Sequence, residues 1–316
     1  MREKKTTSIA MTTYNGEKYI RKQLLSLVGQ SVLPDEIVVI DDKSNDSTIF
    51  ELKKFQQEYM DLFKINIIEN KTNLGYNLNF LKAASYCNCD IIFFADQDDI
   101  WHEQKIEKFL NIFDQYEDLE AVSSSFSLID ERDLRIKKFF SSNKFLFENN
   151  GFIKFSSQVR NFYSSGMTLA VKNTSYEQLR KVIEKDNLFF DTFAGLFFSL
   201  RGTFFKIKDE LTYHRIHLNN TSAPVNNVKD YFSKKDRIIL SRQSRVKHLK
   251  SLIIHYADML DLEEEYLLKN EVSNLMRSIE LVEAFRYIDF FNIIKNLNKF
   301  SNKKLYFQLL LFKILT

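Results

Sequence analysis

Four short apolar runs, each followed by a stretch whose apolar residues have helical spacing, constrain the fold of this 316-residue chain most strongly. Continuous runs such as Ile-Ile-Phe-Phe-Ala at 91–95 are typical of strands that are buried on both faces of a sheet. The expected strands are 8–13, 36–40, 65–69 and 91–95, and the expected helices are 17–28, 48–59, 78–85 and 104–116. Strands that alternate with helices predict an α/β fold with a mostly parallel, doubly wound sheet.

The alternation weakens in the middle of the chain and is replaced by helical spacing towards its end. Between about 120 and 220 the expected strands are 122–128, 167–171 and 204–207, among polar loops. From about 228 onward the pattern is helical, and neither Gly nor Pro interrupts it. We therefore predict an α/β domain over 1–222 and a helical region over 223–316, with the boundary near Ala223-Pro224.

Composition excludes several classes of protein. With 44% apolar and 28% charged residues, and only 7 Gly and 2 Pro, the chain is neither disordered nor of low complexity. A net charge of +3 without a zinc-finger, ribonucleoprotein or basic-zipper motif predicts no nucleic-acid partner. Cys87 and Cys89 are too close for a disulfide and too few for a structural zinc site, so we expect reduced thiols. No signal-peptide core or spanning apolar run is visible, which predicts a cytoplasmic protein.

Three carboxylates, Asp96, Asp98 and Asp99, follow the expected strand at 91–95 directly. Doubly wound sheets bind ligands at the carboxyl ends of their strands. A hard cation such as Mg²⁺ or Mn²⁺ could be held there by one or two carboxylates together with the oxygens of a diphosphate. A solvated turn with a helix cap is the simpler explanation, but three acids beside Trp101 are dense for a cap. We therefore predict a metal and diphosphate site, with the cation neutralising charge on a departing nucleoside diphosphate.

A second acidic pair, Asp41-Asp42, ends the second expected strand. A carboxylate there can accept the imino N–H of uracil or thymine. Asp46 can cap the helix that follows, which leaves Asp41 or Asp42 for a ligand. Thr12 at the end of the first expected strand and Tyr14 just after it could pack against the base or bond the ribose, although such residues often have no role of this kind. We predict Asp42 as the residue that recognises the base.

Four segments stand in an order and at a spacing that carry a family resemblance. They are Met11-Thr12-Thr13-Tyr14-Asn15-Gly16, Ile40-Asp41-Asp42-Lys43-Ser44-Asn45-Asp46-Ser47-Thr48, Asn73-Leu74-Gly75 and Asp96-Gln97-Asp98-Asp99-Ile100-Trp101. Together they resemble the family 2 glycosyltransferases, which have the Rossmann-like GT-A fold of nucleotide-diphospho-sugar transferases. The last segment, with Arg215-Ile216-His217-Leu218-Asn219-Asn220, looks like the branch labelled rhamnosyltransferase-like. The resemblance covers about residues 6–222, some two thirds of the chain.

The resemblance implies an inverting transfer from a nucleotide sugar to a saccharide or lipid-linked oligosaccharide acceptor in the synthesis of cell-surface polysaccharide. An acceptor hydroxyl attacks the anomeric carbon, a carboxylate takes its proton, and Mg²⁺ or Mn²⁺ stabilises the diphosphate. The donor expected first is dTDP-rhamnose. UDP-linked hexoses stay open, because uracil and thymine present the same imino group.

The resemblance also implies that the catalytic base is an acidic residue just before a helix on the acceptor side. Asp191 is the candidate, although the family usually has His or an acid at the position that Phe190 takes here. A carboxylate next to Phe189, Phe190 and Phe193 is expected to have its pKa raised by desolvation, which suits it to proton abstraction. A helix cap is the alternative function of Asp191.

The segment that begins at Arg215 implies a basic residue and a histidine over the diphosphate. His217 could bind the metal as imidazole or bind phosphate as imidazolium, and Arg215 could bind the diphosphate. A lone histidine in a loop is more often structural. The segment Ser165-Gly166-Met167 resembles the loop that shapes the donor-sugar and acceptor pocket in the family, with a tight turn as the alternative.

Two basic segments lie in the helical region. Residues 229–250 carry eight Lys or Arg against two Asp, and residues 290–316 carry five Lys and no acid. The second segment interleaves these lysines with many apolar residues, as in helices that lie on an anionic membrane surface. We therefore expect peripheral contact with the inner face of the cell membrane. A helix that docks on the catalytic domain, or on a second copy of the chain in a homo-oligomer, is the alternative.

Two other functions compete with glycosyl transfer. A nucleotidyltransferase that acts on sugar phosphates also uses metal-bound carboxylates on a similar sheet, but it usually carries a Gly-rich basic loop after the first strand. Residues 12–16 contain one Gly and no Arg or Lys. A degenerate, non-catalytic transferase domain that serves as an assembly partner is the second alternative, and the presence of Asp98 and Asp191 argues against it.

Overall fold

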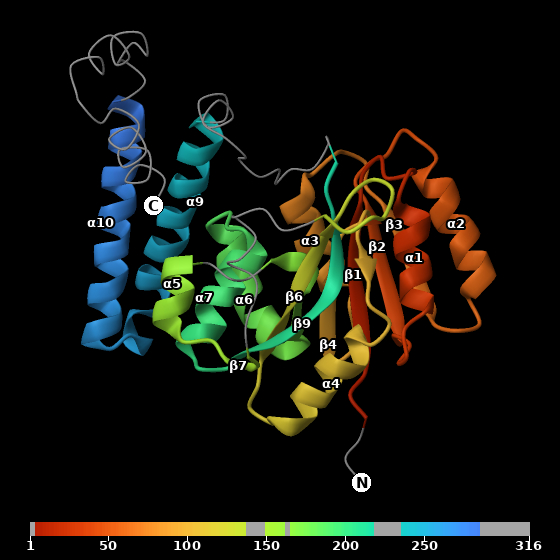
Figure 1. The fold of residues 1–316 in the computed structure, drawn as a ribbon, viewed down its shortest axis with the longest axis horizontal. Coiled ribbons are helices and arrows are strands. Elements are labelled where there is room, and N and C mark those ends of the chain that lie inside the picture. The colour runs from red at the N-terminus through yellow and green to blue at the C-terminus, as the bar shows by residue number, and fades with distance from the viewer. Residues whose placement is uncertain (1–3, 137–148, 162–164, 218–234, 285–316) are drawn as a thin grey trace. The chain divides into compact units, whose positions relative to one another are not determined.

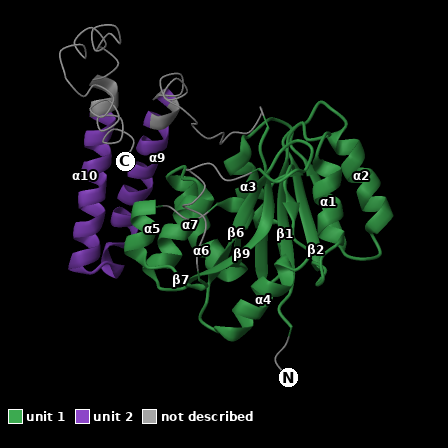
Figure 2. Cartoon of the chain, in the orientation of Figure 1, with its two compact units in different colours: residues 1–224 green, residues 225–316 purple. Residues whose placement is uncertain are grey.

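The computed structural model describes residues 4–136, 149–161, 165–217 and 235–284. By its internal contacts the chain divides into two compact units, residues 1–224 and 225–316 (Figure 2). The predicted division between residues 222 and 223 falls in the segment 218–234, outside the described residues, and stays a prediction.

One mixed sheet forms the centre of the first unit (Figure 1). Its strands are β1 (Thr7–Thr13), β2 (Glu36–Asp41), β3 (Lys64–Glu69), β4 (Ile91–Ala95), β5 (Ile100–Trp101), β6 (Ala121–Ile129), β7 (Gly151–Phe152), β8 (Leu169–Lys172) and β9 (Phe204–Arg215). The strand order is β3-β2-β1-β4-β8-β6-β9-β5, and β7 pairs with β9. The parallel, doubly wound sheet predicted from the first four repeats is confirmed for β1 to β4. Beyond β4 the sheet is mixed, because β8 runs antiparallel to both of its neighbours.

Helices cover both faces of this sheet (Figure 1). They are α1 (Ile20–Val28), α2 (Thr48–Tyr59), α3 (Tyr76–Ser85), α4 (Lys105–Gln115), α5 (Phe155–Asn161), α6 (Asn173–Lys185) and α7 (Phe190–Leu200), with a 3-10 turn η2 (Gly166–Thr168) before β8. Apolar residues of α1, α2 and α4 share one core cluster with alternate residues of β1, β2 and β4. The helix α3 packs against β1 and β2. All seven residues of β1 are buried, as expected for a strand covered on both faces.

The helix α7 was not predicted from the periodicity of the sequence, although the family resemblance implied a helix at Asp191. Its residues are Phe-Asp-Thr-Phe-Ala-Gly-Leu-Phe-Phe-Ser-Leu, and eight of them are buried. A helix that is apolar on all sides has no amphipathic period, so its sequence resembles that of a buried strand. This helix positions Asp191 in its first turn.

The second unit contains α9 (Lys235–Tyr256), a 3-10 turn η3 (Ala257–Met259) and α10 (Leu262–Ala284). The two helices pack through buried leucines, among them Leu249 and Leu268. Among the helices that the structure describes, none has the length and hydropathy that crossing a membrane would require. The predicted membrane segment 290–316 lies outside the described residues.

Candidate functional site

A cavity of about 830 Å³ opens at the carboxyl ends of β1, β2 and β4. The strand order reverses between β1 and β4, which is the switch point where open α/β sheets bind ligands. The volume of the cavity lies in the range of sites that bind small molecules. Six of the eight predicted site residues line it, namely Thr12, Tyr14, Asp42, Asp96, Asp98 and His217. The structure thus brings together predicted residues from the ends of β1, β2 and β4 and from the segment that follows β9.

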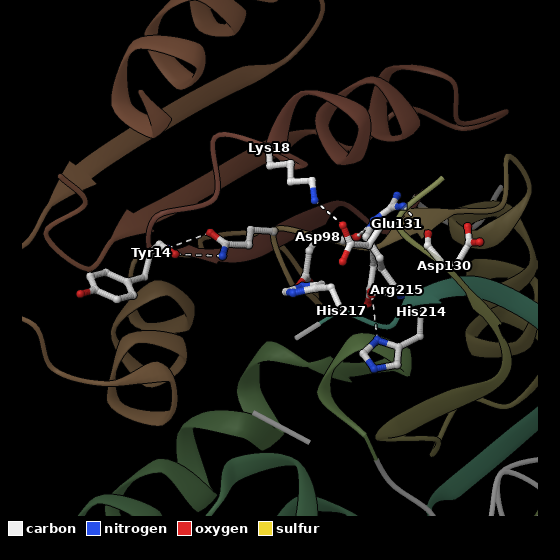
Figure 3. A network of polar contacts seen from close by, with 10 residues as sticks. Tyr14, Lys18, Asp98, Asp130, Glu131, His214, Arg215 and His217 are labelled. Carbon is white, nitrogen blue, oxygen red and sulfur yellow. Dashed lines mark hydrogen bonds and ion pairs between the residues drawn. The ribbon is translucent and has the colours of Figure 1, made fainter. Parts of the chain in front are cut away.

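The loop after β1 is fastened to the loop after β4 by Gln97. The Tyr14 N–H donates to Gln97 Oε1 at 2.8 Å, and Gln97 Nε2 donates to the Tyr14 carbonyl at 3.0 Å (Figure 3). Gly16 lies against this amide so closely that a Cβ there would come within 2.2 Å of Gln97 Oε1. The loop thus holds Tyr14, whose side chain is 49% exposed, at the pocket.

The two carboxylates at the end of β2 have different surroundings. Asp41 is buried and accepts hydrogen bonds from the Thr13 and Ser44 hydroxyls, so it closes the turn. Asp42 lines the cavity and accepts from Asn70 Nδ2 and from the backbone N–H groups of Leu74 and Gly75, each at 2.8 Å. A carboxylate has about four acceptor positions, so Asp42 keeps capacity for one more donor. Its recognition of a base stays a prediction.

Two carboxylate–imidazole pairs join the loop after β4 to the end of β9. Asp98 Oδ2 lies 2.7 Å from His217 Nε2, and Asp99 Oδ1 lies 2.8 Å from His214 Nδ1 (Figure 3). The short antiparallel pairing of β5 with β9, which sets Ile100 opposite Tyr213, brings these residues together. Both imidazoles line the cavity.

Burial and neighbouring charges both shift the pKa values of the acidic and imidazole groups at this site. Burial raises the pKa of Asp96 well above its usual range, and the charges of Asp99 and Asp98 raise it further. Burial and Asp99 also raise the pKa of Asp98, while the hydrogen bond from His217 lowers it. Burial alone would lower the pKa of His214, but the neighbouring carboxylates, first of all Asp99, outweigh it and raise the pKa to about 9. The shift favours the charged imidazolium form of His214 at neutral pH.

These residues fit a divalent cation that shares its coordination shell with a substrate. Within the described parts of the chain, no group of three or more His, Cys, Asp or Glu side chains is arranged as a complete metal site. Asp98 and His217 offer one carboxylate and one imidazole, and a diphosphate and water would supply the remaining ligands. Burial raises the pKa values of Asp96 and Asp98, and a bound cation would favour the charged forms of both carboxylates.

Arg215 lies elsewhere than the sequence analysis suggested. Its side chain is fully buried and is not among the residues that line the cavity. Arg215 and Asp98 are neighbours (Figure 3), and the guanidinium donates from Nε to the Asp98 carbonyl at 2.8 Å. It also pairs with Asp133 and lies 4.7 Å from the centre of the Tyr19 ring. Arg215 thus holds the backbone that carries Asp98. Diphosphate binding by Arg215 stays a prediction, and this geometry does not favour it.

The candidate base, Asp191, lies in the first turn of α7 and outside the cavity lining. Asp191 Oδ2 accepts the Gly166 N–H at 3.0 Å, and Oδ1 accepts the Thr192 N–H. Burial raises the pKa of Asp191, and these hydrogen bonds offset part of that effect. Its charge also contributes to the raised pKa of Asp96, so the two carboxylates influence each other across the site. The predicted direction of the Asp191 pKa shift is confirmed, but a role as base stays a prediction.

Neither His214 nor Gln97 was predicted as a site residue. The predicted strand 204–207 was too short, whereas β9 continues to Arg215. A longer strand would have placed Thr212 and His214 on one face. Gln97 could have been recognised only from its position between two acidic residues after a buried strand.

Comparison with known proteins agrees with this geometry. The model of the family described as Glycosyl transferase family 2 matches residues 8–192. A dTDP-rhamnosyl transferase, RfbG of Shigella flexneri, is 38% identical over 104 residues, which are 32% of this chain and 36% of that protein. A glycosyltransferase of Haemophilus influenzae without an assigned substrate is 26% identical over 232 residues, covering 72% of this chain and 71% of its own.

Solved structures with a similar fold include fragment 1–349 of S. aureus TarS. Its complex with UDP has a TM-score of 0.52 at 14% identity, covering 89% of this chain and 91% of TarS 1–349. Its complex with UDP-GlcNAc has a TM-score of 0.53 at 17% identity, covering 88% and 83%. At such low identity the likeness establishes the fold alone.

Proposed function

Because the chain belongs to glycosyl transferase family 2 and has the GT-A fold, we propose that it transfers a sugar from a dTDP- or UDP-linked donor to a saccharide, with inversion. The observation that supports this most is the arrangement around the cavity. Asp96 and Asp98 line it beside two imidazoles, and the charge of Asp191 acts on Asp96. A donor with its diphosphate at Asp98 is proposed to place its sugar towards Asp191.

On the donor side, Asp42 and the Tyr14 loop are proposed to hold the nucleoside. Asp42 would accept the imino N–H of the base with its remaining acceptor position. Asp98 and His217 would hold Mg²⁺ or Mn²⁺, which when bound neutralises charge on the leaving diphosphate. His214 adds a second positive charge at the cavity wall, since Asp99 keeps it protonated.

On the acceptor side, Asp191 is proposed to take the proton of the attacking hydroxyl. In a single displacement, the hydroxyl oxygen bonds to the anomeric carbon while the bond from that carbon to the diphosphate oxygen breaks. The proton passes to Asp191, and the pair of electrons leaves with the nucleoside diphosphate. The raised pKa of Asp191 makes it a stronger base than an exposed aspartate.

An experiment can narrow the range of candidate nucleotide-sugar donors. The name of RfbG makes dTDP-rhamnose the first donor to test, and the TarS complexes keep UDP-linked sugars open. The protein would be incubated with Mn²⁺ or Mg²⁺ and a panel of dTDP- and UDP-sugars, and release of dTDP or UDP would be followed with and without EDTA. We expect release from at least one donor that EDTA suppresses. If no donor is hydrolysed or bound, the proposed function is wrong.

The proposal also includes where in the cell the reaction takes place. A lipid-linked oligosaccharide acceptor would place the enzyme in the cytoplasm at the inner face of the membrane, and the free thiols Cys87 and Cys89 are compatible with that reducing compartment. The basic segments 229–250 and 290–316 would meet an anionic surface. Co-sedimentation with anionic and neutral vesicles, for the full chain and for a chain that lacks 290–316, tests this. Equal binding by both chains would exclude 290–316 as the anchor, and sedimentation analysis would detect a homo-oligomer.

A further inference from the structure

A pair of exposed aromatic rings lies at the edge of the cavity. Tyr76, at the start of α3, and Phe189, which precedes α7, stack with ring centroids 5.7 Å apart and planes inclined by 14°. Tyr76 is 50% exposed and Phe189 is 37% exposed. Tyr76 lines the cavity, whereas Phe189 extends the aromatic surface beyond it. We call this pair the aromatic shelf.

The shelf is held in place by the buried side chain of Asn77. Its Nδ2 donates to the Leu188 carbonyl at 2.7 Å, and its Oδ1 accepts the Phe190 N–H at 3.1 Å. Both neighbours of Phe189 are buried, at 0% and 2% exposure, so the chain is anchored on either side of the one exposed ring. Breaking a buried amide pair of this kind is costly. The shelf is therefore built before any ligand arrives.

The charges of two carboxylates act on Tyr76, the residue of the shelf that lines the cavity. Burial raises the pKa of Tyr76, and the charges of Asp191 and Asp96 raise it further. Its hydroxyl thus stays neutral and can donate or accept a hydrogen bond. Phe189 stands two residues before Asp191 and is not among the residues that line the cavity. A molecule resting on the shelf would therefore contact the segment that leads into Asp191.

We propose that the aromatic shelf of Tyr76 and Phe189 binds a ring of the acceptor saccharide through its C–H face. This inference rests on the proposed function. The C–H bonds on one face of a sugar ring carry slight positive charge and are attracted to the negative face of an aromatic ring. The donor sugar is tied to the diphosphate inside the cavity, and Phe189 lies outside that cavity, so the acceptor is the occupant that the geometry favours.

Binding of simple sugars tests the shelf without requiring turnover. The probes are methyl glycosides of common hexoses and 6-deoxyhexoses, added to the protein with UDP or dTDP and Mn²⁺. Saturation-transfer NMR would detect which glycosides bind and through which protons. We expect at least one glycoside to bind through ring C–H protons, and Phe189→Ser to weaken that binding about 10-fold. Binding of UDP or dTDP by calorimetry is expected to change less than about 2-fold.

Matched variants separate this role from a structural one. Phe50 on α2 and Tyr86 after α3 are also exposed aromatic residues, at 65% and 45%, and neither lines the cavity. Phe50→Ser and Tyr86→Ser are expected to leave glycoside binding unchanged. If Phe189→Ser does not fold, Phe189→Leu keeps most of the apolar area and removes the ring face, and several-fold weaker binding is still expected.

Three other outcomes are possible, and each would show that a different part of the proposal is wrong. If the wild type binds none of the glycosides, or if Phe189→Ser and Phe189→Leu bind them as the wild type does, the shelf is not an acceptor site. If the variants instead weaken binding of the intact nucleotide sugar while UDP binds normally, the shelf contacts the donor sugar. Failure of every nucleotide sugar to bind or react would count against the proposed function itself.

Discussion

Asp98 Oδ2 and His217 Nε2 lie 2.7 Å apart at the cavity wall, although 119 residues separate them in the sequence. On their own, a carboxyl group and an imidazole at this distance form a hydrogen bond, either between neutral groups or assisted by charge. Asp96 faces the same cavity, and in the proposed function Asp98 and His217 would supply two of the ligands that a divalent cation needs.

Removing Asp98 or His217 should abolish metal-dependent binding of the donor. For Asp98→Ala and His217→Ala we expect nucleotide affinity in Mn²⁺ to fall at least about 10- to 100-fold, because a ligand is lost. In EDTA the variants and the wild type should bind alike. Calorimetric titration with UDP or dTDP measures both cases, and the exposed Asp61→Ala is the control. Equal affinities with and without metal in the wild type would contradict a metal site.

Asp191→Asn should remove turnover and keep donor binding. The amide can still accept the Gly166 N–H but cannot take a proton, so kcat is expected to fall about 10²- to 10⁴-fold. Because the pKa of Asp191 is raised, the wild-type rate should fall with decreasing pH through a value above the ordinary 3.8. Glu184→Gln, a carboxylate change on the surface of α6, should leave the rate unchanged. A large loss of donor binding in Asp191→Asn would argue for a structural role instead.

Stability should depend on the protonation of His214. Its pKa in the folded protein, about 9, lies above the ordinary 6.5, so the imidazolium stabilises the fold fully below about pH 6.5. This contribution, on the order of 3 kcal/mol, should be lost as the pH rises through 9. Urea unfolding at pH 6, 7.5 and 9.5 gives the free energy of unfolding of the wild type and of His214→Gln. The difference between the two proteins at each pH measures the contribution of the charged imidazole. A difference that stays constant with pH would show that Asp99 does not hold a charged His214.

The substitution Gly166→Ala should disturb Asp191, the candidate base, by displacing the neighbouring residue Phe190. A Cβ at Gly166 would lie 2.8 Å from Phe190 Cζ, and Phe190 is buried, so the ring or the backbone next to Asp191 must move. We expect a loss of about 1–3 kcal/mol in the free energy of unfolding, together with a lower kcat. At Gly151 a Cβ would meet nothing within 4 Å, so Gly151→Ala is the matched control. Unchanged stability and rate in Gly166→Ala would mean that this contact is not tight.

The amino-acid sequence by itself determined the strands β1 to β4 and the residues that follow them. Continuous apolar runs can be read locally, and parallel strands place their carboxyl ends at one edge, so Thr12, Tyr14, Asp42, Asp96 and Asp98 could be expected together. Their chemistry also predicted a diphosphate and a cation. Periodicity could not predict the helix α7, because burial on all sides removes its amphipathic period, and only the family resemblance implied a helix at Asp191.

The tertiary structure decided which distant groups complete the site. The register of β5 on β9 brings His214 to Asp99 and buries Arg215 against the Asp98 backbone, whereas the sequence alone suggested Arg215 for the diphosphate. The side chain of Asn77 leaves Phe189 exposed beside Tyr76 between two buried neighbours. Periodicity reports only local structure, while register and burial depend on contacts between residues about a hundred positions apart, and no local pattern contains them.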